Sequence, residues 1–417
     1  MKFWINHIFR TCIFIAFLFQ EIAGETKSFN LEEFVDRALE KDPGIIETRL
    51  GREATEARQA AKLAVPDPEI SLSYGTDVFG NDEGEHGFGL SLSQPFRLPK
   101  QKKALREIAN ARTALAVASQ REAAWLAKLK AKQLFHRLLA ARQRLELSRK
   151  AGELANELAS FAATAAARGE ASKIDAGQTR LKSLEANDTR FAHEQVYNEL
   201  VGNARSVLLI KQNDELIIEG TLEFPKARIL PPNDLLALKS TRPDLMKAFH
   251  EEERTSAKLR EIKSKRWGSW ALQGFVEHAR EMDSPDGLQR ERSHGLALSV
   301  ILPWWGRGRA ELQAGHAEAK TFSMRREALA QTVIQDLRTA VDREAALFRR
   351  LSNFRDELTP LAEKNAEEAL ESFSLGQISL RQVLLVREDA LRLQEEFIDL
   401  LLEYHLAAIG LEAALGK

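Results

Sequence analysis

Two stretches of this sequence, far apart in the chain, follow one pattern. His86–Phe96 reads HGFGLSLSQPF and His294–Trp304 reads HGLALSVILPW, with His, Gly, Leu, Ser and Pro at matching places and an offset of 208 (294 − 86). Pro43 and Pro243 recur at a similar interval (243 − 43 = 200). A period this long exceeds the roughly 20–50 residues of solenoid repeats. We therefore expect two copies of one large structural unit in a single chain.

Both stretches alternate large apolar residues with small or polar ones, which is the pattern of a β-strand. The same alternation is found in Ile70–Tyr74, Trp270–Val276 and Leu296–Leu302. Each copy is therefore expected to contain a β-hairpin, at about 69–96 and 267–303, with the charged segment His278–Ser293 as a loop. One hairpin alone leaves two interpretations open. Its apolar face packs on a soluble core, or it faces lipid while the small and polar residues line a lumen.

A long proline-free segment follows the first hairpin. It runs from Lys100 to about Arg168 and is rich in Ala, Leu, Glu, Lys and Arg, which predicts one helix. At ~1.5 Å per residue such a helix is about 100 Å long, as in a coiled coil. Gly169 is expected to end it in a tight turn, and Ser172 is expected to be the N-cap of a returning helix.

The second copy repeats this plan. A helix is expected from about Gly306 to Ser374, followed by a turn at Gly376 and an N-cap at Ser379. Gly152 lies 17 residues before the first turn (169 − 152), and Pro360 lies 16 before the second (376 − 360). Both long helices are therefore expected to be weakened at a corresponding level.

The N-terminal residues resemble an export signal. Lys2 and Arg10 precede or flank a short apolar run, Cys12–Phe19, and small residues follow at Ala23 and Gly24. The only cysteine lies in this segment, so the mature chain is expected to contain no thiol. The expected organisation is a signal at 1–24, a first repeat at 25–210, a linker at 211–233 and a second repeat at 234–417.

Composition argues against several classes of function. The chain has 60 basic and 61 acidic residues, which is not the basic excess of a nucleic-acid-binding protein. Its nine histidines are scattered and no catalytic constellation is present, so no enzyme activity, cofactor or metal site is expected. His86 and His294 recur at strand starts, and we interpret them as interface residues in preference to metal ligands.

In combination, these features resemble the TolC-type outer-membrane efflux duct family. The resemblance rests on the duplication, on TRPDLM at Thr241–Met246, on QPFRLPKQKKA at Gln94–Ala104, and on the turns at Gly169 and Gly376. It implies a mostly α fold with a small β part, in which duplicated long helical hairpins form an α-barrel. Four strands per chain would contribute to a 12-stranded β-barrel of a trimer. It also implies a location in the outer membrane, with the helices extending into the periplasm.

The resemblance implies partners as well. They are the other subunits of a homotrimer, a periplasmic adaptor (membrane fusion) protein, an inner-membrane pump of the RND type and outer-membrane lipid. The hairpin-exit motif and the compact length look most like the heavy-metal cation efflux branch. The alternative is a periplasmic coiled-coil adaptor or scaffold protein, which would have one helical hairpin and a membrane anchor where this chain has two hairpins.

The resemblance also suggests site residues. Family turns read Gly-x-x-Ser/Thr-x-x-Asp, and Asp175 completes the first turn while Gln382 replaces the acid in the second. Asp175, in a capping-box-like position, and Arg381 are candidate gate residues, with a helix cap and a solvated side chain as the simpler interpretation. The residues expected to dock the adaptor are Gly169, Ser172, Gly376 and Ser379. The residues expected to form an aromatic girdle at the membrane interface are Phe96, Trp267, Trp270, Trp304 and Trp305. The alternative is that these aromatic residues pack in a core.

Overall fold

The computed structural model describes residues 26–76, 85–169, 171–211, 214–225, 242–283, 287–302 and 307–417. They belong to two compact units, each built from both repeats. The helical unit contains the chain up to Glu47, Ala123–Arg242 and Thr332–Lys417, and the strand unit contains Thr48–Glu122 and Pro243–Gln331. The predicted signal at 1–24 and the pair Trp304–Trp305 lie outside the described residues.

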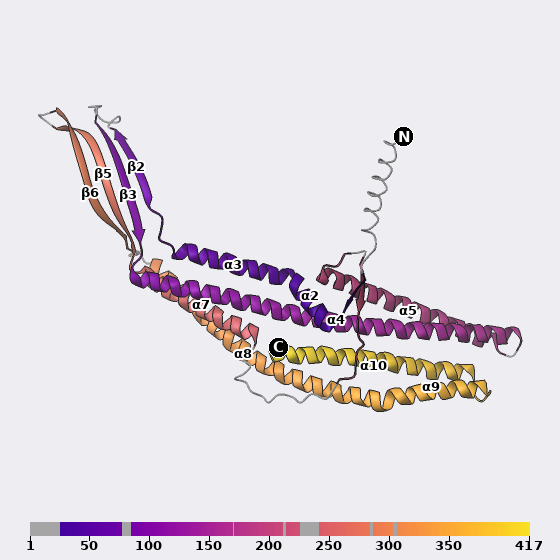
Figure 1. Cartoon of the computed structure of the whole chain (residues 1–417). Helices are drawn as coiled ribbons and strands as arrows, with labels where there is room; N and C mark the ends of the chain where they lie inside the picture. Colours follow the sequence, from indigo (N-terminus) through magenta and orange to yellow (C-terminus); the bar gives the residue numbers. More distant parts are fainter. Residues whose placement is uncertain are drawn as a thin grey trace, which may run out of the picture. The chain divides into compact units, whose positions relative to one another are not determined.

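The elements follow the predicted order in both repeats (Figure 1). The first repeat contains β1 (Thr26–Phe29), α2 (Leu31–Lys41), α3 (Pro43–Leu63), β2 (Glu69–Thr76), β3 (His86–Phe96), α4 (Pro99–Ala167) and α5 (Lys173–Leu208). After β4 (Glu215–Ile218), the second repeat contains α7 (Pro243–Lys265), β5 (Ser269–Asp283), β6 (Gly287–Ile301), α8 (Arg307–Asn353), the π-helix η1 (Phe354–Leu358), α9 (Thr359–Ser374) and α10 (Leu380–Ala414). The matching prolines begin α3 and α7, because a proline is well tolerated at the first helical position.

The two long helices differ at the levels where weakening was expected. Helix α4 is continuous over 69 residues and passes through Gly152. The second long helix is divided into α8 and α9 by η1, where the N–H of Thr359 donates to the carbonyl of Phe354, five residues back. Pro360 follows directly, and it lacks the N–H that would bond four residues back. Glycine keeps its N–H and costs only about 1 kcal/mol in a helix, so only the proline changes the winding.

The strands of both repeats form one sheet. Its order is β2-β3-β5-β6 and all pairs are antiparallel, so the two hairpins join through β3 and β5. Strands β5 and β6 are longer than predicted, and the expected loop His278–Ser293 is mostly strand. The prediction was wrong because the alternation continues through this segment with charged side chains in place of apolar ones.

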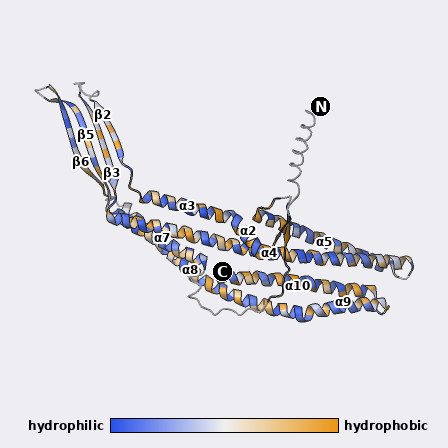
Figure 2. Cartoon of the chain, in the orientation of Figure 1, coloured by the Kyte–Doolittle hydropathy of each residue, from blue (hydrophilic) through white to orange (hydrophobic). Residues whose placement is uncertain are grey.

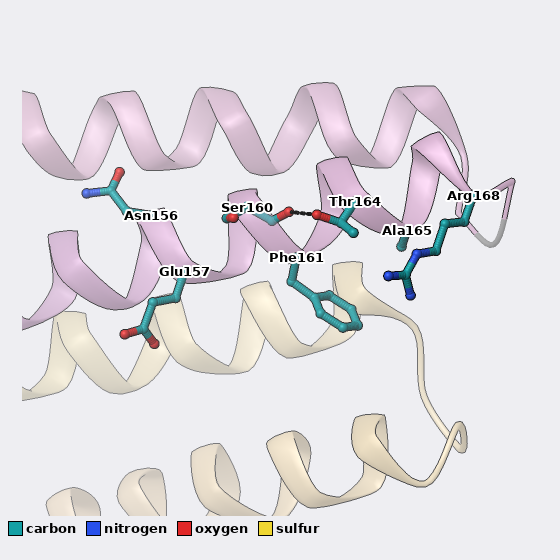
Figure 3. Close-up of a pocket in the computed structure, with 7 residues that line it drawn as sticks. All are labelled: Asn156, Glu157, Ser160, Phe161, Thr164, Ala165 and Arg168. Carbon is teal, nitrogen blue, oxygen red and sulfur yellow. Dashed lines mark hydrogen bonds between the residues drawn. The ribbon is translucent and has the colours of Figure 1, made fainter.

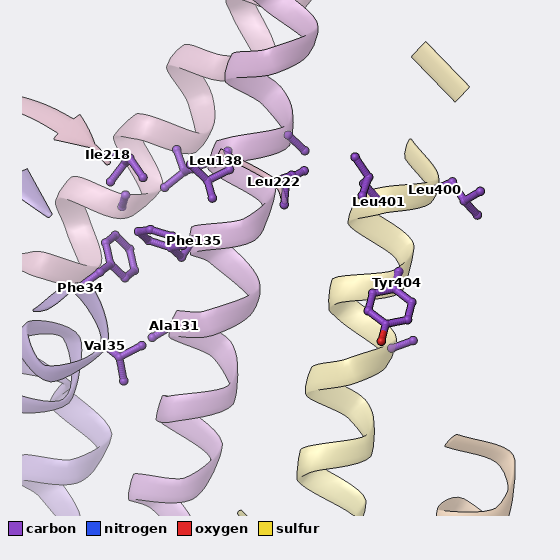
Figure 4. Packing of buried hydrophobic residues seen from close by; sticks show 14 of the residues in the cluster. Phe34, Val35, Ala131, Phe135, Leu138, Ile218, Leu222, Leu400, Leu401 and Tyr404 are labelled. Carbon is purple, nitrogen blue, oxygen red and sulfur yellow. The ribbon is translucent and has the colours of Figure 1, made fainter. Parts of the chain in front are cut away.

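The core of the helical unit packs residues from both repeats. Phe34 of α2 and Phe135 of α4 meet edge to face, with ring centroids 5.5 Å apart, and Ile218 of β4 is buried in the same cluster (Figure 4). Strand β4 lies within the predicted linker 211–233 and pairs in parallel with β1. Burial of the whole cluster stabilises the unit by roughly 25 cal/mol for each Å² of apolar surface removed from water.

Two groups of polar side chains in this unit show how polar atoms are accommodated near the core. The hydroxyl of Tyr404 donates to the buried carboxylate of Glu344 at 2.5 Å. The rings of His136 and His405 stack with centroids 4.6 Å apart. Burial, followed by the neighbouring His405, lowers the pKa of His136 to about 4. Both imidazoles are therefore neutral at pH 7, which permits close stacking without charge repulsion.

Candidate functional site

One face of the sheet carries large apolar side chains, and we call it the apolar face. Residues paired across neighbouring strands share a face, so register rows can be followed across the sheet. Apolar and polar residues alternate along the strands (Figure 2). Three successive rows on the apolar face are Gln94–Leu272–Leu298, Ile70–Leu92–Gly274–Leu296 and Leu72–Leu90–Val276–His294.

The apolar face is exposed to an unusual degree. Leu296 is 80% exposed and Leu72 is 69% exposed, so no element of the described chain covers them. Monomeric soluble proteins rarely expose more than a few hundred Å² of contiguous apolar surface. We therefore interpret this face as one that another molecule covers, which disfavours the soluble-core interpretation of the hairpins. Separately, no described helix is both long enough and apolar enough to cross a membrane.

An aromatic cluster marks the end of the apolar face nearest the helices. Phe96 and Trp270 are paired across β3 and β5 with ring centroids 6.4 Å apart. The indole N–H of Trp270 donates to the carbonyl of Trp267 at 2.8 Å, and the ammonium of Lys100 lies 4.6 Å from the ring centroid of Trp267. Aromatic rings beside a cation are typical of a membrane–water interface. The structure thus brings together three of the five residues predicted for the girdle.

A second aromatic pair, which sequence analysis did not assign to a girdle, marks the other end. Tyr74 and Phe88 are paired across β2 and β3 on the apolar face. Phe88 lies eight positions from Phe96 (96 − 88), or about 26 Å along the strand at ~3.3 Å per residue. A strand tilt of about 40° reduces this to a height of roughly 20 Å, close to the ~25 Å apolar band between the girdles of membrane barrels.

Apart from Phe275, two successive rows on the opposite face of the sheet consist of small or polar residues. One row is Ser71–Ser91–Phe275–Gly295, and the next is Ser73–Gly89–Glu277–Ser293. The hydroxyl of Ser293 lies 3.5 Å from the carboxylate of Glu277. Such side chains tolerate water, as the lumen-facing residues of a barrel must.

The two predicted turns share one backbone conformation. Gly169 and Gly376 follow α4 and α9 with φ values of 78° and 73°, in the left-handed region. In the second turn, the N–H of Gly376 donates to the carbonyl of Phe373, and the N–H of Gln377 donates to that of Ser372. These two bonds define a Schellman motif, which satisfies the last carbonyls of a helix and favours glycine.

The helices after the turns begin with capped N-termini. Ser172 caps α5 by accepting a hydrogen bond from the N–H of Ile174. Ser379 caps α10 in a capping box, because the side chain of Gln382 accepts from the N–H of Ser379 at 2.9 Å. The capping box was expected at Asp175, but of the two turns only the second has one, with Gln382 as its partner residue.

The candidate gate residues do not meet within one chain. Asp175 and Arg381 lie in the first turns of α5 and α10, and no ion pair joins them among the described residues. Helix α5 is instead linked to α10 by Lys182, whose ammonium lies 3.1 Å from the carboxylates of both Glu185 and Glu388. The hydrogen bonds that Lys182 donates, first to Glu185 and then to Glu388, raise the pKa of its ammonium group.

The helical hairpins also make contact beside the turns. Phe161 of α4 meets Phe373 of α9 edge to face, with ring centroids 5.8 Å apart. A furrow lies along α4 just before the first turn, and Phe161 projects from it towards the other hairpin (Figure 3). It is lined by Asn156, Glu157, Ser160, Phe161, Thr164, Ala165 and Arg168.

The recurring histidines do not form a ligand pair. His86 is paired with Arg280, whereas His294 is paired with Val276, so the two lie on the same face but in different rows with β5 between their strands. In the described residues no group of three or more His, Cys, Asp or Glu is arranged to hold a metal ion.

No protein-family model and no curated protein matches this sequence. Solved structures do match. A membrane protein from Pseudomonas aeruginosa is 19% identical and covers 93% of this chain and 90% of its own, with a TM-score of 0.75. The CmeC outer membrane channel of Campylobacter jejuni is 14% identical and covers 93% and 85%, with a TM-score of 0.76. The open state of the Neisseria gonorrhoeae MtrE outer membrane channel is 14% identical and covers 93% and 89%, with a TM-score of 0.75.

These structural matches extend over most of the length of both compared chains, so they include the helical hairpins as well as the sheet. At this level of identity they establish shared architecture. The chain therefore has the fold of the TolC-type outer-membrane channels, as the resemblance in its sequence predicted.

Proposed function

We propose that this protein is the outer-membrane channel subunit of a tripartite efflux system. The observation that carries the proposal is the exposed apolar face, bounded by aromatic residues at both ends and backed by a polar face. Lipid is the molecule best suited to cover this face, because acyl chains can contact rows of apolar side chains without a specifically shaped partner surface. The protein would act as a passive duct and not as an enzyme.

The proposal includes assembly into a trimer. Strands β2 and β6 are the edges of a four-stranded sheet, and an open edge cannot remain unpaired in lipid. A closed barrel needs at least about eight strands. Two chains would supply eight strands, and three chains would supply twelve. The resemblance favours three, with β6 of one chain pairing with β2 of the next.

The remaining partners follow from the resemblance. A periplasmic adaptor would dock on the turns at Gly169 and Gly376, and an inner-membrane RND-type pump would deliver the substrate. Heavy-metal cations are the proposed cargo, on the strength of the hairpin-exit motif at Gln94–Ala104. A wide aqueous duct discriminates little between solutes, so the pump would determine which substrate is exported.

Cell fractionation followed by sizing in detergent tests the function. We expect the protein in the outer-membrane fraction, extractable only with detergent, and with the mass of three chains. The exposed leucines explain the need for detergent, because they aggregate in water. Recovery of a stable monomer from the periplasm without detergent would contradict the channel and favour the coiled-coil scaffold.

The gate proposal gives a second prediction. In a trimer, Asp175 and Arg381 are proposed to pair between neighbouring chains and to hold the entrance closed. Exposed pairs contribute roughly 0–1 kcal/mol, so Asp175→Ala and Arg381→Ala should each raise the open fraction in planar bilayers by about two- to fivefold. The double variant should add little to either single change.

Asp188→Ala is the matched control, since Asp188 is an exposed acid of the same helix but lies farther from the turn. It should leave the open fraction unchanged. Wild-type conductance in both single variants would mean that Asp175 and Arg381 have no role in closure.

A further inference from the structure

The charged residues of β5 and β6 are sorted by face. The apolar face carries His278 and Arg280 on β5, and Arg290 and Arg292 on β6. The opposite face carries Glu277 and Glu291. Basic residues thus continue the apolar face towards the hairpin ends, and acidic residues continue the polar face. This is the segment whose charge had suggested a loop.

The arginines form a compact cluster. Arg280 is directly opposite Arg290 in the register, and the neighbouring row on the same face pairs His278 with Arg292. Paired strands are about 4.8 Å apart, and successive residues on one face are roughly 6.6 Å apart along a strand. All three guanidinium groups therefore lie within reach of one anionic group. We call these three residues the arginine cluster.

This arrangement is unfavourable unless an anion is present. Like charges directly opposite in an antiparallel pair destabilise a sheet. Among the residues that the structure describes, no carboxylate forms an ion pair with Arg280, Arg290 or Arg292, and the nearby acids of the same strands are on the other face. Within the described part of the chain the cluster thus has no carboxylate counter-ion, and we take an external anion as its counter-ion.

The position of the cluster indicates which anion. His86, next to Arg280 in the register, lies one row beyond the aromatic pair Tyr74–Phe88. Moving along the apolar face from the helices, one passes aromatic rings, aliphatic rows, and then a row that holds Tyr74 and Phe88 together with Arg292. Arg280 and Arg290 lie one row further. That order matches the layers of a bilayer, from one interface through the hydrocarbon to the headgroups of the far leaflet.

We propose that the arginine cluster binds the phosphate groups of an anionic lipid in the outer leaflet. Guanidinium groups bind phosphate oxygens in a bidentate manner, and several of them converge here. The acyl chains of the same lipid would lie along the leucine rows of the apolar face. The lipid, and not free phosphate, is the proposed ligand because only it uses both parts of the surface. This inference rests on the proposed membrane location of the sheet.

The test measures, by native mass spectrometry, how much lipid A the full-length oligomer binds at equilibrium in detergent. Lipid A is a saccharolipid that carries two phosphate groups. The wild type should retain lipid A and prefer it over dephosphorylated lipid A and phosphatidylcholine. The triple variant Arg280→Gln, Arg290→Gln, Arg292→Gln should bind lipid A at least about tenfold more weakly, because basic residues at a membrane surface act nearly additively. Inorganic phosphate should not compete at equal concentration.

The matched control is Glu277→Gln with Glu291→Gln, which changes charge on the same strands but on the opposite face. Its lipid A binding should equal that of the wild type. Should the triple variant fail to assemble, Arg290→Gln alone, on an exposed position of the edge strand, should give a smaller loss in the same direction.

The outcomes separate the two proposals. An assembled, membrane-inserted wild type that shows no preference for phosphorylated lipid would overturn the arginine-cluster inference and leave the channel intact. Equal competition by inorganic phosphate would also overturn it, in favour of a simple ion site. A chain that neither assembles nor inserts would refute both.

Discussion

Leu296→Arg is expected to remove the protein from the outer membrane. Leu296 lies in the middle row of the apolar face and is 80% exposed. An arginine at the bilayer midplane on the lipid side costs about 2–4 kcal/mol, and a trimer would carry three. We expect the variant to accumulate as unassembled chains, which heat-modifiable gel mobility of outer-membrane fractions would show. Leu298→Arg, one row away, should give the same defect.

Ala297→Arg supplies the control, because it lies next to Leu296 in sequence but on the polar face, in a row with Gln273 and Ser93. A guanidinium group there would face water, so assembly should be normal. If Leu296→Arg and Ala297→Arg insert equally well, the apolar face does not face lipid.

Replacing both turn glycines by valine is expected to abolish export while the trimer still assembles. Gly169 and Gly376 have φ values of 78° and 73°, and a β-branched residue is strained there by about 1–3 kcal/mol. A Cβ at either position would meet no atom within 4 Å, so the penalty comes from the backbone and not from a clash. The turns should change shape and lose the adaptor, which co-purification and a substrate-resistance assay would measure.

Two control variants make this test sharper. Asparagine tolerates the left-handed conformation, so Gly169→Asn with Gly376→Asn should retain most of the export. Gly177→Ala, inside α5, removes a glycine near the first turn without a positive φ and should have no effect. Unchanged export in the double valine variant would place adaptor docking elsewhere.

Several features could be predicted from the sequence because their causes are local. Helix α4 follows from a proline-free, alanine-rich segment, and the alternation HGFGLSLSQPF follows from the two-residue period of a strand. The turns at Gly169 and Gly376 were found for the same reason, since a left-handed residue after a helix favours glycine. The error at His278–Ser293 shows the limit of this reasoning, because charge was taken as evidence for a loop when its periodicity was still that of a strand.

The sequence by itself determined the duplication, the type of each large element and the apolar side of each strand, because these depend on neighbours within a few residues. Only the tertiary structure decided how the elements are combined. It paired β3 with β5 across about 180 residues, placed Tyr74 beside Phe88, and set Arg280 opposite Arg290. It also made β4 a strand by pairing it with β1. The reason is that strand register and edge pairing are contacts between distant segments, and no local pattern encodes which distant partner is nearest.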